Sequence, residues 1–390
     1  MNTLQKGVVT LIRSALTQQP YKLPDDFSIE DAAEIIRLHC IATLCYEGAA
    51  LCGVPTDTPF MEELFKVYCA TTIKSIRQEA AVSKLFHAFE LSGIDYIPLK
   101  GCRMRPLYPK PELRNMGDAD VLIRSEQYDR IVPIVRKLGY ELYAQTDHDY
   151  SWTSKDLFLE LHHRLMPPEE IAYTAIYEDG WLSAKPQFGS RWEFSPEDEW
   201  LYLFDHFTKH YITGVGIRQV SDLWMFLKTF PDLDKAYLES QLTKLNFGEF
   251  YTNVLSLISM WFDDAQPTDK TDFMTDYIFS SGTWGTLETK EASKLAYEAE
   301  KRIPIPAMFF KRIWHFFFPK PEYLEIVFPK LREHRWLYLF YAFVRPFVRI
   351  TNDRLAPKRW YNILRFFSKK SLDNKQNHLA YVGLKLNRLI

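Results

Sequence analysis

Short signatures of several large enzyme classes are missing from this 390-residue chain. It has no GxxxxGKS or GxxxxGKT phosphate-binding loop, no GxGxxG dinucleotide fingerprint and no GxSxG nucleophile elbow. The zinc-protease pattern HExxH is missing too. These absences count against ordinary P-loop enzymes, Rossmann dehydrogenases and α/β-hydrolases. The chain also shows no internal repeat and no low-complexity segment.

Cysteine is scarce and shows no paired spacing. The five cysteines are Cys40, Cys45, Cys52, Cys69 and Cys102. Their number is odd and no CxxC occurs, so the simplest interpretation is free thiols in a reducing cytoplasm. No cysteine and histidine stand at a spacing that indicates a nucleophilic thiol.

Long hydrophobic runs are also missing. The longest late run extends from Leu337 to Val344, whereas a spanning helix needs about 20 apolar residues. Near the N-terminus, Lys6 and Arg13 interrupt the apolar residues, so we expect no secretory signal. The sequence therefore predicts a cytoplasmic protein with no transmembrane segment.

Charge is nearly balanced over the whole chain but is unevenly distributed. Apolar residues make up 47% and charged residues 25%, with a net charge of −2, which is typical of a globular protein. Residues 301–390 hold 19 Lys and Arg against 5 Asp and Glu, a net of +14. This basic and aromatic region either docks on the more acidic body or forms a surface for phosphate-bearing partners.

The residue pattern predicts an α+β protein with four regions. Helical periodicity dominates at first, and a small mixed-sheet core follows, flanked by large helical regions. The regions are an N-terminal helical region at 1–69, an α/β core at 70–170, a helical domain at 171–300 and a basic aromatic C-terminal region at 301–390. Within the core we expect strands at 94–99, 119–123, 140–144, 150–153 and 157–162, with a helix at 125–138.

Helix signals in the flanking regions vary in strength. Asp26 or Ser28 is expected to cap an early helix, and another is expected over 61–91, with a break near residue 70 and its end at Gly93. Ser195 is the strongest helix start, because a proline and three acids follow it. After Pro168 the chain is expected to become helical again.

Two aspartates in the core indicate a metal site. Asp118 and Asp120 are two apart at the start of a predicted strand, so both carboxylates should lie on one face. Glu160 is a charged residue inside an apolar strand and is the natural third carboxylate. Carboxylate oxygens suit Mg²⁺ or Mn²⁺. The alternative is that the aspartates cap a strand end and that Glu160 pairs with an arginine.

Several segments together resemble a known superfamily. They are Leu99-Lys100-Gly101, Arg114, Asp118-Ala119-Asp120, Glu160-Leu161-His162 and His210 with Arg218 and Asp222. Over roughly residues 70 to 230 the chain resembles the nucleotidyltransferase superfamily, which includes polymerase-beta-like and aminoglycoside nucleotidyltransferases. More narrowly it is similar to an uncharacterised bacterial nucleotidyltransferase family. Gly101 is followed here by Cys102, whereas the superfamily usually has Gly or Ser.

The resemblance implies metal-dependent transfer of a nucleoside monophosphate from an NTP, such as ATP, to an acceptor hydroxyl. Asp118, Asp120 and Glu160 would be the catalytic and metal-binding residues, with Mg²⁺ or Mn²⁺ as the cofactor. The nucleotide-binding residues would be Lys100, Gly101, Arg114, His210 and Arg218. The acceptor would be a small molecule, an RNA or a protein.

Each accessory residue keeps a plainer interpretation. Lys100 is either a phosphate contact or a solvated turn residue, and Gly101 belongs to a tight turn in both cases. Arg114 either steers the triphosphate or pairs with Asp118 or Asp120. Arg218 and Asp222 have the spacing of an ordinary helix pair.

The two histidines at positions 206 and 210 share a helix face, which suits half a zinc site, a place near the nucleotide or simple packing. His162 shares the face of Glu160 and is placed to orient it.

Two other functions remain open at this stage. One is a nucleotide-binding or interaction module without catalysis. The other is a peripheral membrane or nucleic-acid adaptor that acts through the basic tail. In this tail, the stretch from Arg335 to Arg349 is apolar and aromatic with interspersed arginines. That same stretch would also suit a buried core helix.

Overall fold

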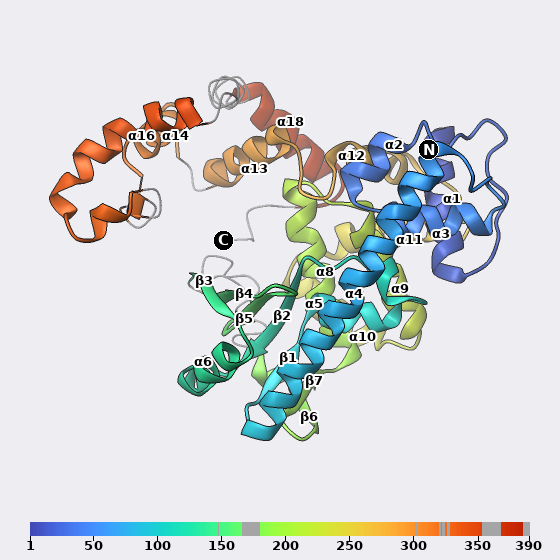
Figure 1. The fold of residues 1–390 in the computed structure, drawn as a ribbon. Coiled ribbons are helices and arrows are strands. Elements are labelled where there is room, and N and C mark those ends of the chain that lie inside the picture. Colours follow the sequence, from blue (N-terminus) through green and yellow to red (C-terminus); the bar gives the residue numbers. More distant parts are fainter. Residues whose placement is uncertain are drawn as a thin grey trace. The chain divides into compact units, whose positions relative to one another are not determined.

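A computed structural model describes residues 1–146, 148–165, 180–300, 303–319, 321, 324–325, 328–352 and 368–384. It confirms the α+β fold class, with one mixed sheet among many helices (Figure 1). The chain forms two compact units. The first comprises Met1–Trp284 with the residues from Val382, and the second comprises Gly285–Tyr381.

The sheet of the first unit has seven strands in the order β3-β4-β5-β2-β1-β7-β6. The strands are β1 (Tyr96–Pro98), β2 (Asp118–Ile123), β3 (Glu141–Gln145), β4 (Asp149–Thr153), β5 (Phe158–His162), β6 (Ala184–Phe188) and β7 (Arg191–Phe194). The pairs β2–β5 and β1–β7 are parallel, and the other neighbours are antiparallel. The sheet is therefore mixed, as the sequence predicts.

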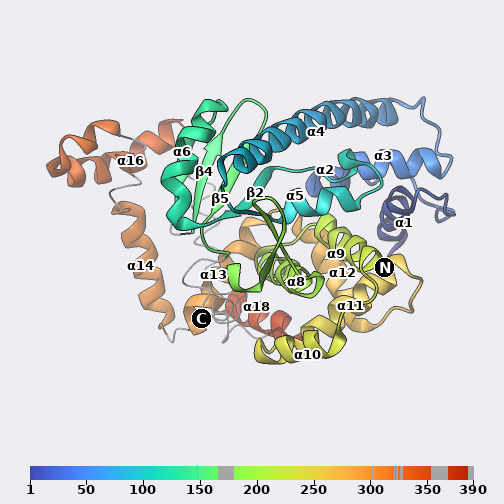
Figure 2. The same ribbon diagram turned by 90° about the horizontal axis from the view of Figure 1, so that it is seen from below.

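The two faces of the central strands differ in polarity. Ala119, Val121 and Ile123 of β2 are fully buried, and they share a core with α4 (Pro59–Ser92) and α6 (Tyr128–Lys137). Figure 2 shows these two helices on one side of the sheet and α8 on the other. Because successive side chains of a strand alternate in direction, the acidic residues of β2 face away from this core.

The long helix α4 differs from its prediction. It runs without interruption over 34 residues, so the expected break near residue 70 is wrong. Thr58 caps its start by accepting from the Met61 amide, and Gly93, with φ of 58°, ends it as predicted. The early helix begins later than expected. It is α2 (Ala33–His39), which has no side-chain cap, so neither Asp26 nor Ser28 caps it.

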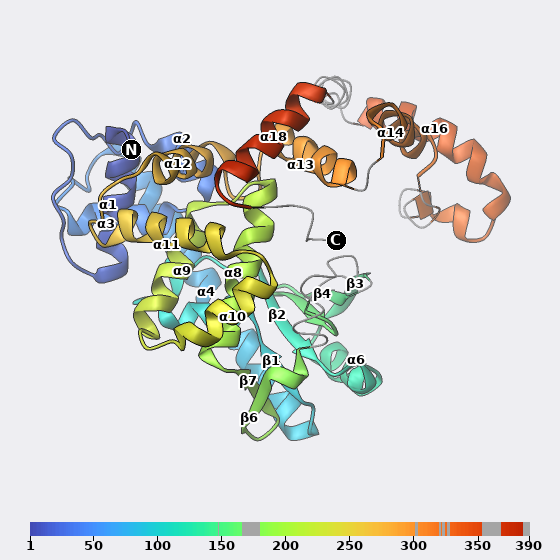
Figure 3. The ribbon, with the colours of Figure 1, turned by 180° about the vertical axis from the view of Figure 1, so that it is seen from behind.

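The remaining helices of the first unit precede the sheet, lie between two of its strands, or follow it along the chain (Figure 3). They are α1 (Thr3–Thr17), α3 (Ala42–Leu51), α5 (Lys100–Met104), α8 (Pro196–Thr213), α9 (Ile217–Thr229), α10 (Lys235–Lys244), α11 (Gly248–Phe262) and α12 (Asp269–Ser281). The predicted start of α8 is confirmed, because the Ser195 hydroxyl accepts from the Asp198 amide at 3.1 Å.

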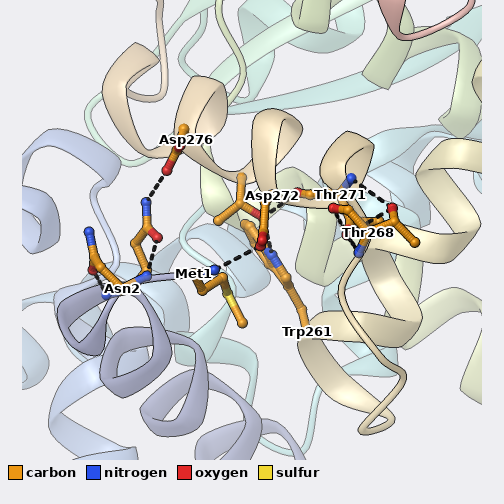
Figure 4. A network of polar contacts seen from close by, with 9 residues as sticks. Met1, Asn2, Trp261, Thr268, Thr271, Asp272 and Asp276 are labelled. Atoms are coloured by element: carbon orange, nitrogen blue, oxygen red, sulfur yellow. Dashed lines mark hydrogen bonds and ion pairs between the residues drawn. The ribbon is translucent and has the colours of Figure 1, made fainter.

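Polar contacts tie the first residues to α12 (Figure 4). The Met1 amino group donates to Asp272 at 2.7 Å, and the Gln5 side chain donates to Asp276 at 2.8 Å. A capping box between Asn2 and Gln5 starts α1. The N-terminal helix is therefore anchored to residues about 270 positions further along the chain.

Strands β6 and β7 correct the expectation that the chain is helical after Pro168. Pro168 itself lies outside the described residues, but the segment from Ala184 to Phe194 is a hairpin that adds to the sheet. β7 joins β1 through one parallel partner pair, Tyr96 and Arg191. Both strands are short, and β6 contains Pro186, so their alternation of polar and apolar residues is too brief to predict a strand. The predicted region boundary at residue 170 stays a prediction.

The second unit consists of helices with a small core. Its longer helices are α13 (Leu287–Glu300), α14 (Ile305–Phe317), α16 (Tyr338–Asn352) and α18 (Lys369–Tyr381). Leu324, Leu331 and Ala342 are buried together, whereas large aromatic side chains such as Trp336 and Phe340 are exposed. Helix α16 is therefore not wholly buried in a core. Within the described residues, no helix has the length and apolar character to cross a membrane.

Candidate active site

Strand register brings the predicted acids together on the polar face of the sheet. Asp120 of β2 and Glu160 of β5 are direct partners in the parallel pair. Asp118 lies two residues before Asp120 on the same strand, so it shares that face one row away. The structure thus places the three acids side by side, and their roles as metal ligands stay predictions.

Three side chains of this face form a tight cluster. Asp120, Glu160 and His162 each offer a ligand atom, and these atoms lie within 4.8 Å of one another. His162 Nε2 lies 3.0 Å from Asp120 Oδ1 and 3.5 Å from Glu160 Oε2. Two carboxylates and an imidazole within this distance form a donor set that suits a divalent cation.

Asp118 extends the negative charge of this cluster. Burial raises the pKa of Asp118 above its usual value, and the negative charges of Asp120 and Glu160 raise it further. Such mutual repulsion among carboxylates is relieved when a cation binds between them. Asp118 and Asp120 both line the cavity described below.

Lys100 holds Asp120 in its charged form. Its Nζ lies 2.7 Å from Asp120 Oδ1. Burial opposes the charge of Asp120, but the positive charges of Lys100 and His162 prevail and keep the pKa of Asp120 well below its usual range. Lys100 has φ of 35°, a left-handed conformation that costs energy in a residue with a side chain.

Gly101 is needed for a reason other than the predicted turn. Lys100 and Gly101 are the first residues of the short helix α5, so the expected turn is wrong. A Cβ at Gly101 would meet Met116 Sδ at 2.8 Å and Arg114 Nη1 at 3.2 Å. The glycine therefore lets α5 approach the loop that leads into β2.

Arg114 pairs with neither predicted acid. Its guanidinium donates to both carboxylate oxygens of Asp222 on α9, at 2.8 and 3.0 Å. The Tyr108 hydroxyl donates to the same carboxylate at 2.7 Å. Asp222 is thus the partner of Arg114 rather than of Arg218. This network joins the loop before β2 to the helical part of the unit.

A cavity lies between the acidic face and two helices. From the sheet and the short helix α5, the lining residues include Lys100, Asp118 and Asp120. From the two helices they include His206 and His210 of α8 and Arg218 of α9. All five predicted nucleotide-binding residues line it; they are Lys100, Gly101, Arg114, His210 and Arg218. Figure 1 shows α8 beside β2 and α5.

The charge states of Arg218 and the two histidines determine the electrostatic character of this cavity. Arg218 donates to the Asn115 carbonyl, and among the described residues no carboxylate forms an ion pair with it. Burial lowers the pKa of His210 to about 4, with a further contribution from Lys100, and lowers that of His206 as well. Both rings are therefore neutral near pH 7, so Lys100, Arg114 and Arg218 supply the positive charge. In the described part of the chain, neither histidine belongs to a three-residue metal group.

Two features of this region were not predicted. The Asp222 partnership joins residues 108 positions apart, and no local pattern signals it. His148 and Asp149 fall between the strands predicted at 140–144 and 150–153, although Asp149 is the strand partner of His162. The adjacent His148 and Asp149 at the start of a strand are the one local signal from which this cluster could have been predicted.

Comparison with known proteins supplies one match. A family model described as "Uncharacterised nucleotidyltransferase" matches residues 25–263. This range includes the described sheet, the cavity-lining parts of α8 and α9, and most of the N-terminal helices. No curated protein and no solved structure matches the chain.

Proposed function

The chain belongs to the uncharacterised nucleotidyltransferase family, whose model covers more than half of its length, and we propose that it moves a nucleoside monophosphate from an NTP to an acceptor hydroxyl with the help of a divalent cation. Membership supports nucleotidyl transfer as the activity. The observation that carries the finer proposal is the cluster of Asp120, Glu160 and His162 beside Asp118, at the edge of a cavity that also holds Arg218.

The donor chemistry of the site fits Mg²⁺ or Mn²⁺. Asp120 is held in its ionised form, and Glu160 is its direct neighbour across the strands. Asp118 completes a set of hard oxygen donors, which these cations prefer. Such a cation, when bound, polarises the phosphate and helps to ionise the attacking hydroxyl.

The cationic residues are placed to bind the triphosphate. Arg218 has no carboxylate partner among the described residues, so its charge is available for phosphate oxygens. Lys100 is the second candidate, once a cation takes its place at Asp120. Arg114 is held by Asp222, so we assign it to shaping the cavity rather than to direct contact.

In the proposed reaction the acceptor oxygen attacks the α-phosphorus in line with the leaving group. The new P–O bond forms as the bond to pyrophosphate breaks, and the hydroxyl proton passes to a base. Glu160 is the best-placed base, because 24% of its side chain is exposed and it adjoins the metal-binding carboxylates. Pyrophosphate leaves with its charge balanced by Arg218 and Lys100.

The test measures nucleotide binding and turnover separately. Calorimetry with each NTP in the presence of Mg²⁺ or Mn²⁺ should show metal-dependent binding, and pyrophosphate release should follow with a suitable acceptor from a panel of sugars, RNAs and proteins. Asp120→Asn and Glu160→Gln should abolish release. Glu141→Gln, on the exposed strand β3, is the matched control and should change nothing. The proposal fails if no NTP binds, or if Asp120→Asn retains full activity. Binding without release would favour a non-catalytic module.

A specific observation favours a second candidate function for the second unit. Trp314, Trp336, Phe340 and Phe343 are more than half exposed, and the last 90 residues carry a net charge of +14. Exposed aromatic residues with basic neighbours are typical of a protein region that binds an anionic membrane surface. We propose such binding as an additional role, separate from the transfer reaction.

A further inference from the structure

We infer that His148 and Asp149, at the start of β4, form a second metal site together with His162 of β5, and that it takes a transition-metal cation such as Zn²⁺. One ligand atom of each residue lies within 4.8 Å of the others. The site shares His162 with the acidic cluster but has a different donor set, with two imidazoles and one carboxylate. It goes beyond the proposed transfer reaction and does not depend on it.

Strand register brings the three residues together. Asp149 of β4 and His162 of β5 are direct partners in an antiparallel pair. His148 precedes Asp149, and its Nε2 lies 3.0 Å from Asp149 Oδ2. The rings of His148 and His162 have centroids 5.9 Å apart. All three side chains are therefore close enough to converge on one ion with small adjustments.

One ring nitrogen of His162 is buried without a hydrogen-bond partner among the described residues, which points to a ligand. The side chain is only 4% exposed, and its Nε2 is engaged by Asp120 at 3.0 Å. The other ring nitrogen, Nδ1, is buried and has no hydrogen-bond partner. A buried polar atom without a partner costs about 1–3 kcal/mol. A cation bound at Nδ1 would satisfy this atom and leave the bond to Asp120 intact.

The surrounding hairpin holds the ligands in place. The Thr146 hydroxyl lies 3.1 Å from His148 Nδ1, so the opposite nitrogen is directed at Asp149. Asp149 Oδ1 accepts from the Ser151 hydroxyl at 3.3 Å. The His163 amide donates to the His148 carbonyl at 3.0 Å. Hydrogen bonds of this kind orient ligands in known metal sites.

The donor set decides which cations fit. Imidazole nitrogen suits Zn²⁺, Fe²⁺, Co²⁺ and Ni²⁺, whereas Mg²⁺ prefers oxygen alone. Three protein ligands leave a position for water or a substrate atom, as in catalytic zinc sites. A cation bound at His148 Nε2 would require any proton on that nitrogen to pass to solvent.

Cobalt is the probe, because its visible absorption reports imidazole and carboxylate coordination. The full-length protein is titrated with Co²⁺ alone, and Zn²⁺ is then added to displace it. We expect one equivalent of Co²⁺ to produce ligand-field bands that Zn²⁺ abolishes. His148→Gln and Asp149→Asn should each weaken Co²⁺ binding at least tenfold. The matched control Asp118→Asn, which alters only the acidic cluster, should keep the bands.

The results separate this site from its neighbour. The inference is overturned if the wild-type protein shows no bands, or if His148→Gln retains them. Loss of the bands in Asp118→Asn would also overturn it, because the ion would then belong to the acidic cluster. Circular dichroism and thermal unfolding of each variant show that it is folded. His148→Gln, at a partly exposed turn position, is the variant least expected to disturb the fold.

Discussion

In the proposed reaction Lys100 would have two opposite effects, because it contacts the Asp120 oxygen that the cation would use. Its Nζ lies 2.7 Å from Asp120 Oδ1, so it competes with a bare cation for that oxygen. In the proposed complex with nucleotide and cation, the same amine would be available to the phosphates. Under this proposal, one side chain would oppose the binding of metal alone and favour the binding of metal with nucleotide.

We expect Lys100→Gln to separate these effects. A charge-assisted hydrogen bond is worth about 1.5–3 kcal/mol, so removing the amine should tighten Mg²⁺ binding in the absence of nucleotide by roughly tenfold. The same change should weaken Mg²⁺-dependent NTP binding by a similar factor. Calorimetry measures both constants. Lys22→Gln, at an exposed surface pair, should alter neither. If the two affinities change in the same direction, the competition between Lys100 and the cation is refuted.

Glu199 provides a test of pH dependence at a single residue. Burial raises the pKa of Glu199 to about 6, although Arg103 donates to it at 2.8 Å and opposes the shift. Because the folded pKa lies above the unfolded value of 4.5, protonated Glu199 favours the folded state. Its contribution is fully present below pH 4.5 and is lost as the pH rises through about 6.

The expected size of this loss is about 2 kcal/mol of unfolding free energy. The glutamine in Glu199→Gln cannot ionise. The unfolding free energy of this variant should therefore lack the loss that ionisation of Glu199 causes as the pH rises. Urea unfolding of both proteins at about pH 4 and about pH 7 measures the difference. Parallel pH profiles for the two proteins would show that Glu199 keeps an ordinary pKa.

At the scale of elements, the close approach of α5 to the loop before β2 depends on Gly101. An added Cβ must displace the buried Met116 side chain or the Arg114 guanidinium. We expect Gly101→Ala to lower the unfolding free energy by about 1–3 kcal/mol, the usual cost of overpacking. Chemical denaturation measures this change.

Gly117 offers a matched control for that substitution. It lines the same cavity, and a Cβ there would meet nothing within 4 Å. Gly117→Ala should therefore change stability by less than about 1 kcal/mol. Equal destabilisation by the two substitutions would contradict the packing argument for Gly101.

The sheet shows how an element can depend on distant partners. β1 is only three residues long and is paired on both sides, by β2 and by β7. Its sequence predicts a strand, because Tyr96 and Ile97 are β-prone and buried. The neighbouring strand β7 has only four residues and owes its conformation to its pairings with β1 and β6. Helix α4, by contrast, continues through the predicted break although its residues 65–74 are exposed or half-buried.

At the scale of the whole molecule, the distribution of charge and exposed aromatic residues predicts surface binding by the second unit. Trp336 is 80% exposed and Phe340 is 60% exposed. We expect the full chain to bind vesicles that contain anionic phospholipid, and added salt should weaken this binding. Replacing both aromatic residues by alanine should weaken vesicle binding at least tenfold. Each aromatic side chain that becomes buried in the membrane surface contributes roughly 1.5–3 kcal/mol.

An equally exposed aromatic residue in the first unit serves as the control. Phe188, on β6, is 84% exposed, and Phe188→Ala should leave vesicle binding unchanged. Equal loss in the control, or no binding by the wild-type chain at low salt, would contradict the proposal. Nucleotide binding should persist in all of these variants, because none of the replaced residues lines the cavity.

The sequence by itself determined the features that depend on neighbouring residues. The start of α8 at Ser195 and the end of α4 at Gly93 follow from local capping. The shared face of Asp118 and Asp120 follows from strand alternation. The α+β class and the family resemblance, carried by short motifs, were also readable at this level.

Only the tertiary structure decided which distant residues meet. The Arg114 and Asp222 pair spans 108 positions, and Lys100 reaches Asp120 across 20. Both depend on how helices and strands are arranged, which no local pattern encodes. The same holds for His148 and His162, since strand order and register bring them together. The physical reason is that long-range contacts form when whole apolar faces of helices and strands are buried against one another. The same order of helices and strands along a chain is compatible with several such arrangements.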